Sequence, residues 1–350
     1  MRLVAMDLET PQDVPEYGLQ PWRAKTGEAT IKSVALWSAD GVFKSAKAMP
    51  SKKYFAEVLA ICAEQKYVIC GWNLLFDIAW LMAIGLEQEV KACTWIDGML
   101  VLKRVDGWRD KEYGGIGFGL KETVADVWPE LEEWSLGEDV TKVPQTEEEW
   151  GRLLTYNLLD SQYTCQLTEF FWNQLSPEER KGAKIEMLCL PDIALSYING
   201  ITINVAALDE LQASVTESLA ENSVIFGADP KIVASPAKLG QLLFEEWGFT
   251  PIKKTPAGKP ATDKETLLKL AIQHPDDPRF GALMALRKCK TRQSKFIDGV
   301  RKSLAYHGGD VTYPKPAIAG TYTGRLTYSS KQNVKVPRKG KKETVDESDE

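Results

Sequence analysis

Apolar and polar positions follow two different periods along the first 175 residues. The segments whose pattern fits strands are 3–9, 31–38, 42–44 and 67–73. The segments with apolar residues at helical spacing are 51–65, 74–84, 117–128 and 146–175, and residues 93–105 join a further strand to a helix. A turn at Asp40 and Gly41 separates the second strand from the third. This order predicts an α/β domain with a mixed sheet over residues 1–180.

The pattern changes after residue 178. Helical spacing dominates up to about residue 304, and Pro and Gly interrupt it at 250–260 and 308–320. Residues 341–350 are polar and acidic, and we expect them to be disordered. The sequence therefore predicts a helical region over 181–304 and a separate short segment over 305–340.

Composition limits the class of protein. A chain of 350 residues, 44% of them hydrophobic, is long enough for two domains and is neither wholly disordered nor collagen-like. No apolar stretch approaches the ~18 residues of a membrane span, and residues 1–10 lack the apolar core of a signal peptide. Six cysteines without a Cys-x-x-Cys pair and only two histidines argue against a zinc site. We expect a cytoplasmic protein with reduced thiols, or one in the host-cell cytoplasm if the chain is viral.

The net charge of −6 conceals an asymmetry. Residues 1–180 carry 18 Lys and Arg against 29 Asp and Glu, whereas residues 253–342 carry 21 against 6. A basic stretch of this kind is either a solvated face or a surface for phosphates. If it binds a polyanion, the acidic half needs divalent cations to approach the same partner.

Carboxylates recur at the ends of predicted elements. Asp7 and Glu9 lie two apart on the first strand, so both project from one face. Asp77 lies four residues after Asn73 in an otherwise apolar segment, where an ionised carboxylate is costly unless it is paired or metal-bound.

A third pattern lies on the long helix predicted over 146–175. Tyr156 and Asp160 are four residues apart and share one helix face. Four carboxylates from three elements suit two hard divalent cations, which serve in-line displacement at phosphorus. The hydroxyl of Tyr156 would orient the attacking water.

Each pattern by itself also fits an ordinary structural role. Asp7 and Glu9 fit surface residues at a strand end, and Asn73 fits a helix N-cap. The pair on the long helix fits a half-buried tyrosine beside an exposed acid. Only the order of the three patterns, each on the appropriate element, favours a catalytic site.

In that order the residues resemble the DEDD superfamily of 3′-5′ exonucleases, in the variant with tyrosine in its third motif. The matching positions are Asp7 with Glu9, then Asp77, then Tyr156 with Asp160. The resemblance implies a ribonuclease-H-like fold and four carboxylates that hold two Mg²⁺ or Mn²⁺ ions. Asn73 resembles a residue that helps to hold the strand end and contacts DNA.

The remainder resembles the thumb and the first polymerase motif of family-A, pol-I-like DNA polymerases. Residues 235–270 and 286–304 resemble the thumb, and residues 320–340 resemble the first polymerase motif at the start of the palm. The resemblance implies DNA contacts by a set of basic and polar side chains: Lys253, Lys254, Lys259, Arg287, Lys290, Arg292, Thr323 and Arg325.

The resemblance ends at about residue 340, before the polymerase carboxylates of that family. The leading hypothesis is therefore a metal-dependent 3′-5′ DNA exonuclease of the proofreading type, within a split or truncated polymerase. Its expected partners are DNA, a second polypeptide with palm and fingers, and a processivity factor; no membrane is expected. The alternatives are a non-catalytic DNA-binding scaffold for a separate polymerase chain and an RNA-trimming exonuclease.

Overall fold

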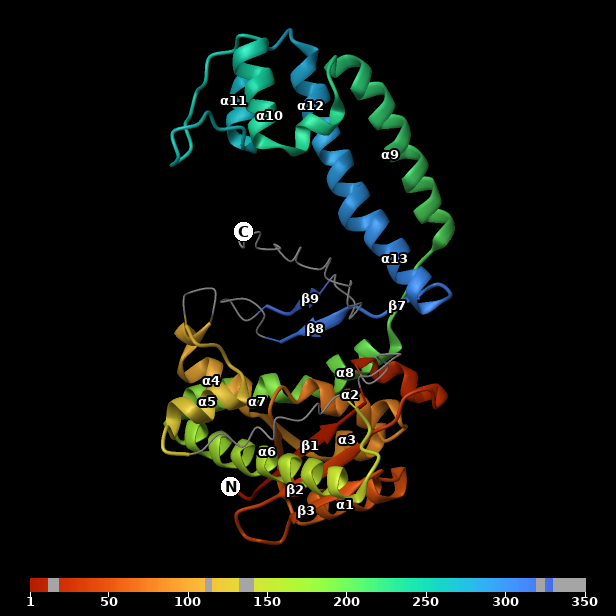
Figure 1. Ribbon diagram of the computed structural model, residues 1–350, viewed down its shortest axis with the longest axis vertical. Coiled ribbons are helices and arrows are strands. Elements are labelled where there is room, and N and C mark those ends of the chain that lie inside the picture. The colour runs from red at the N-terminus through yellow and green to blue at the C-terminus, as the bar shows by residue number, and fades with distance from the viewer. Residues whose placement is uncertain (12–18, 111–114, 132–141, 319–324, 330–350) are drawn as a thin grey trace, which may run out of the picture. The chain divides into compact units, whose positions relative to one another are not determined.

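The computed structural model describes residues 1–11, 19–110, 115–131, 142–318 and 325–329 (Figure 1). The chain forms two compact units, one of residues Met1–Gly200 with Tyr313–Glu350 and one of residues Ile201–Thr312. The first unit therefore extends past residue 180, where the sequence suggested a boundary. It does so because Leu190, Ala194 and Tyr197 are buried in its core.

A five-stranded mixed sheet organises the first unit. Its strands are β1 (Leu3–Glu9), β2 (Ser33–Trp37), β3 (Lys44–Ala48), β4 (Val68–Gly71) and β5 (Thr94–Asp97), in the order β3-β2-β1-β4-β5. The β1–β2 and β2–β3 pairs are antiparallel, whereas β1–β4 and β4–β5 are parallel. The predicted mixed sheet is confirmed. β1 is central, and all its residues are buried except Asp7 and Glu9, which are partly exposed.

Helices surround this sheet. They are α1 (Lys52–Glu64), α2 (Leu75–Ala83), α3 (Glu87–Ala92), α4 (Gly98–Val105), α5 (Leu120–Val127), α6 (Glu147–Gln174), α7 (Pro177–Leu188) and α8 (Leu190–Asn199). α6 packs on β1, β2, β3 and β4 (Figure 1). It begins with a capping box between Thr146 and Glu149, and three glutamates in its first turn interact favourably with the helix dipole.

The third strand differs from the prediction. We expected it at 42–44, but β3 begins at Lys44, paired with Trp37. Ser38 and Asp40 explain the difference, because their side chains accept hydrogen bonds from the backbone N–H groups of Phe43 and Val42. These bonds extend the turn, so strand pairing begins only at Lys44. The short α3 was also not predicted.

The second unit is mainly helical, as predicted. It contains α9 (Val205–Phe226), α10 (Pro236–Gly240), α11 (Lys264–Gln273), α12 (Pro278–Thr291) and α13 (Asp298–His307). π-helical segments continue α10 over Gln241–Glu246 and join α12 to α13 over Arg292–Ile297. α9 packs along α12. A two-stranded pair, β6 (Ile201–Thr202) and β7 (Val311–Thr312), brings the two ends of the unit together.

The last described elements are the strands β8 (Lys315–Ala317) and β9 (Thr327–Ser329), which pair with each other in the first unit. The segment resembling a polymerase motif therefore includes β9. Among the described residues, every helix is too short or too polar to cross a bilayer.

Candidate metal centre

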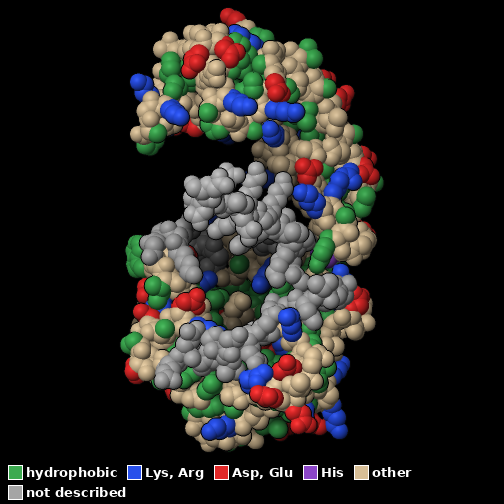
Figure 2. All heavy atoms as spheres, viewed as in Figure 1, with side chains coloured by type: hydrophobic (Ala, Val, Ile, Leu, Met, Phe, Trp, Pro, Cys, Tyr) green, Lys and Arg blue, Asp and Glu red, His purple; other side chains and the backbone are tan. Residues whose placement is uncertain are grey.

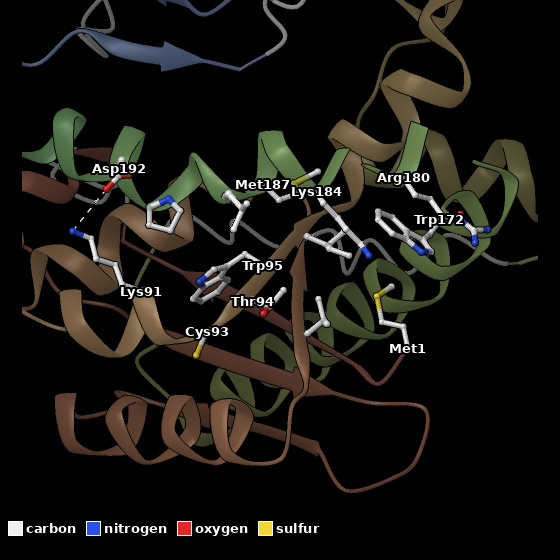
Figure 3. A pocket seen from close by; sticks show the side chains of 14 residues that line it. Met1, Lys91, Cys93, Thr94, Trp95, Trp172, Arg180, Lys184, Met187 and Asp192 are labelled. Carbon is white, nitrogen blue, oxygen red and sulfur yellow. Dashed lines mark hydrogen bonds and ion pairs between the residues drawn. The ribbon is translucent and has the colours of Figure 1, made fainter. Parts of the chain in front are cut away.

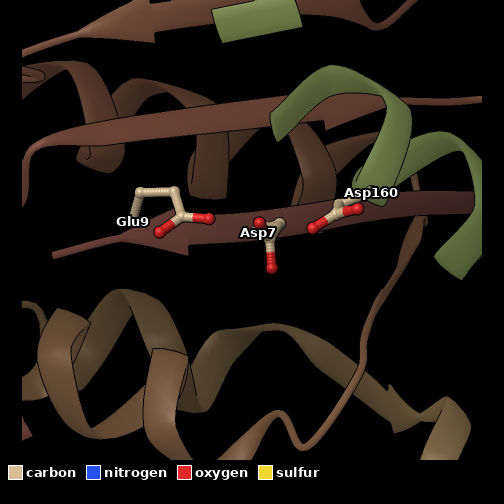
Figure 4. A group of neighbouring side chains, drawn as sticks. All are labelled: Asp7, Glu9 and Asp160. Atoms are coloured by element: carbon tan, nitrogen blue, oxygen red, sulfur yellow. The ribbon is translucent and has the colours of Figure 1, made fainter. Parts of the chain in front are cut away.

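Three carboxylates from two elements converge in the first unit. Asp7 and Glu9 project from the same face of β1, and Asp160 comes from α6, which packs on that strand. One carboxylate oxygen from each residue can be chosen so that all three atoms lie within 4.8 Å of one another. Figure 4 shows the three side chains side by side along β1. A separation of this size suits oxygen ligands around a divalent cation.

The fourth predicted carboxylate, Asp77, lies beside this group without being part of it. Asp77 is 5% exposed in the first turn of α2. Its Oδ1 accepts a hydrogen bond of 3.1 Å from the backbone N–H of Leu8, the residue between Asp7 and Glu9. One oxygen of Asp77 is therefore held by β1.

Burial and mutual repulsion raise the pKa values of these acids. The pKa of Asp7 is well above its ordinary value, first because of burial and then because of the charges of Glu9, Asp77 and Asp160. Burial also raises the pKa of Asp77, although the hydrogen bond from Leu8 opposes the rise. Such a group of acids ionises readily only when a cation compensates its charge. The donor atoms are all oxygens, which fits Mg²⁺ or Mn²⁺.

Two lysines partly compensate the charge of Glu9. Burial raises its pKa from 4.5 to about 7, Lys32 and Lys121 oppose the rise, and Asp160 adds to it. Lys32 is fully buried and its Nζ donates to the carbonyl of Lys142 at 3.1 Å. The sequence analysis missed both lysines, since neither belongs to a recognisable motif.

Tyr156 lies one helical turn before Asp160 on α6. Burial raises the pKa of Tyr156 far above its ordinary value, and the charge of Asp160 and a hydrogen bond to it raise the pKa further. The ammonium of Lys121 lies 4.7 Å from the centre of the Tyr156 ring. The phenol therefore stays protonated, and its O–H remains a hydrogen-bond donor beside the carboxylate group.

Asn73 does not act as the N-cap considered from the sequence. It has a positive φ of 61°, and Leu74 occupies the N-cap position of α2 without a side-chain hydrogen bond. Asp97 does the capping instead. Its carboxylate accepts hydrogen bonds from the N–H groups of Asn73 and Leu74, and also from two N–H groups at the start of α4. The only signal in the sequence is an acid at the junction of a strand and a helix.

The basic residues predicted to contact DNA are mostly exposed on the second unit. Lys253, Lys254 and Lys259 lie on the exposed loop before α11, and Lys253 pairs with Asp263 at 3.4 Å. Figure 2 shows basic side chains among acidic and apolar ones on the visible face of this unit. These three lysines are accessible to phosphates.

The other predicted DNA contacts differ from one another in their surroundings. Lys290 and Arg292 are exposed, whereas Arg287 is half-buried and donates to the backbone carbonyls of Val233 and Thr262 at 3.3 and 2.9 Å. Arg287 therefore has a structural role, since it links α12 to the segments that contain Val233 and Thr262. Arg325 is exposed just before β9. Thr323, from the same predicted motif, falls outside the described residues.

The sequence is similar to DNA polymerases over part of its length. Residues 205–345 match the model of DNA polymerase family A. A DNA polymerase of Bacillus phage SP01 is 30% identical over 113 residues, and DNA polymerase I of Pseudomonas aeruginosa is 25% identical over 189 residues. Residues 205–345 are thus similar to DNA polymerase family A. The resemblance of the chain to this family is thereby confirmed.

The chain spans only part of the length of these two polymerases. The alignments cover 32% and 52% of this chain but 12% and 20% of the two polymerases. The fold is similar to that of the POL domain of Pol1 from M. smegmatis, solved in complex with DNA primer-template and dNTP. The TM-score is 0.61 at 17% identity, with coverage of 96% of this chain and 52% of that one. The family-A match begins at residue 205, so it does not include the carboxylate group.

Proposed function

We propose that the chain is a metal-dependent 3′-5′ DNA exonuclease of the proofreading type and part of a family-A polymerase. In this proposal the first unit is a ribonuclease-H-like exonuclease and the second unit is a thumb. The observation that carries it is the convergence of Asp7, Glu9 and Asp160 within 4.8 Å. Asp77, bonded to the same strand, would complete the set of ligands.

These four acids would hold two Mg²⁺ or Mn²⁺ ions. Bound divalent ions supply activation of a water and stabilisation of the leaving oxygen in phosphodiester hydrolysis. The contribution of the chain is a rigid, partly buried set of oxygens. The pKa values of Asp7 and Glu9 are raised, so protons compete with the cation for these oxygens. Cation binding should therefore strengthen as the pH rises.

Tyr156 would position the water that attacks the terminal phosphodiester. Its hydroxyl is protonated and bonded to Asp160, and the residue is only 7% exposed, so the hydroxyl is held in one place. Lys121, which lies over its ring, would steady the phenol and offset negative charge near Glu9.

DNA is the proposed substrate because of the second unit. Family-A relatives are DNA polymerases, and the solved relative holds a primer-template. The exposed lysines before α11 and the exposed Lys290 and Arg292 would bind the phosphate backbone without regard to sequence.

The test is exonuclease activity on single-stranded DNA labelled at its 5′ end. With Mg²⁺, Asp7→Ala and Asp160→Asn should each lower the rate of 3′ nucleotide release by about 10³-fold, equivalent to several kcal/mol. Glu57→Gln on the surface of α1 is the matched control and should be unaffected. Wild-type rates in either site variant would end the proposal, and equal rates on RNA of the same sequence would reassign the substrate.

A non-catalytic DNA-binding scaffold is the second candidate. It is favoured by the family-A match, which covers residues 205–345 and none of the carboxylate group. EDTA separates the two candidates, because it should abolish exonuclease activity and leave DNA binding intact. DNA binding without any metal-dependent cleavage would favour the scaffold.

A further inference from the structure

A cavity lies in the first unit, at the β5 edge of the sheet. It has a volume of about 830 Å³ and is formed by β5, α7, the start of α8 and the end of α6 (Figure 3). We call it the β5 pocket. None of the four acids or Tyr156 lines it. A volume of this size accommodates a drug-sized ligand or several residues of a peptide.

The floor of the β5 pocket is apolar. Trp95, Ile96, Trp172 and Met187 contribute side chains that are each less than a tenth exposed. Trp95 donates its indole N–H to the carbonyl of Val90, so its ring is fixed. The floor is thus a preformed apolar surface rather than a gap that could collapse.

The charges around the β5 pocket are unequally compensated. At one end, Lys91 pairs with Glu87 at 2.8 Å and with Asp192 at 3.8 Å. Towards the other end, Arg180 and Lys184 have no carboxylate partner among the described residues, and the guanidinium of Arg180 is anchored by the carbonyls of Trp172 and Asn173. Figure 3 shows Lys91 with Asp192 and Arg180 with Trp172 at opposite ends. The pocket therefore attracts an anionic group at one end only.

Apolar surface continues from the β5 pocket onto its rim. Leu188 and Met1 line the pocket and are 74% and 57% exposed, and Ile185 on the same helix as Leu188 is 59% exposed. A small ligand inside the cavity would leave these side chains in water. An extended polypeptide would cover them, and exposed apolar side chains at the rim of a pocket favour such a partner.

We propose that the β5 pocket docks an extended segment of a partner polypeptide that combines apolar side chains with a carboxylate. The apolar side chains lie on the floor between Trp95 and Met187. The carboxylate binds Arg180 and Lys184, which selects acidic segments over basic ones. This site is independent of the carboxylate group and of the nuclease activity proposed above.

The test uses an array of heptapeptides with two apolar positions flanked by acidic, neutral or basic residues, probed with the full chain. The acidic set should bind, and fluorescence anisotropy of its strongest member should give a Kd that Lys184→Glu weakens about tenfold. Lys184 is exposed, so this change should leave the fold intact. Leu188→Asp should also weaken binding, whereas Lys181→Glu on the same helix, outside the pocket, should not.

Three outcomes would overturn the proposal: no acidic peptide binds, acidic and basic peptides bind equally, or Lys184→Glu binds as well as wild type. Binding of dAMP, but of no peptide, in a manner that depends on Lys184 would identify a nucleotide site instead. Asp7→Ala should bind the peptide normally, so failure of the nuclease proposal and failure of this one are distinguishable.

Discussion

Glu9→Gln should stabilise the metal-free protein at neutral pH and have little effect at acidic pH. The pKa of Glu9 rises from 4.5 to about 7 on folding, mainly because of burial. The folded state therefore binds this proton more tightly than the unfolded chain does. The contribution of Glu9 to stability is most favourable below about pH 4.5 and is lost as the pH rises through about 7.

The size of the effect follows from the same change. One pKa unit corresponds to about 1.4 kcal/mol, so a rise from 4.5 to about 7 costs the ionised protein about 3 kcal/mol. Glutamine avoids this cost because it cannot ionise. In EDTA at pH 8 the free energy of unfolding of Glu9→Gln should exceed that of wild type by up to about 3 kcal/mol, and at pH 4.5 the two should be nearly equal.

Urea unfolding followed by tryptophan fluorescence is the assay. Trp247 is the only tryptophan within residues 201–312, so the signal reports mainly the first unit. Added Mg²⁺ should narrow or reverse the difference at pH 8, because the cation binds the wild-type site more tightly. Asp40→Asn should show the opposite dependence on pH, since hydrogen bonds from Ser38 and Tyr67 hold the pKa of Asp40 well below its ordinary value. A difference between Glu9→Gln and wild type that does not vary with pH would refute the reasoning.

Four further variants test separate contacts. Asp97→Ala removes the acceptor of four N–H groups and should lower the free energy of unfolding by about 2–4 kcal/mol in the same urea assay; a loss under 1 kcal/mol would contradict its capping role. Tyr156→Phe should lower kcat for nucleotide release on the order of 10²-fold with KM for DNA unchanged, and a change in KM alone would argue against water positioning. Arg287→Ala should destabilise the second unit by about 1–3 kcal/mol in thermal unfolding. Lys290→Ala should instead leave stability unchanged and reduce the salt dependence of DNA binding by about one unit of slope; identical behaviour of these two variants would refute the distinction.

Local signals predicted the long elements well. The helix expected at 146–175 is observed over Glu147–Gln174, because its capping box and its periodicity are both encoded within a few residues. The strand expected at 3–9 matches β1 for a similar reason, since an apolar run ending in acids needs no distant partner to be recognised. The two-residue strands β6 and β7 were not predicted, because so short a pairing depends on where the ends of the second unit meet.

Long-range contacts could not be predicted from single residues. Lys32 is the second residue of the strand expected at 31–38, and a lysine there would ordinarily be placed in water. It is buried because Glu9 and the carbonyl of Lys142, far away in sequence, both face it. Asp97 is similar: its position before Gly98 indicates a helix start, but its second role in capping α2 appears only when β4 and β5 are paired.

The convergence of the acids depends on a contact that no motif contains. α6 buries a polar stripe that includes Asn157, Ser161 and Thr164, and such small side chains allow the helix to lie close to the sheet. Asn157 donates from Nδ2 to the hydroxyl of Ser33 at 3.0 Å, and Ser33 is the ladder partner of Glu9. Asp160 lies three residues after Asn157, so this buried bond helps to fix the position of Asp160 along β1 relative to Glu9. The proposed ligands follow from the sequence, but their geometry depends on contacts between α6 and the sheet, made by residues that are not themselves proposed ligands.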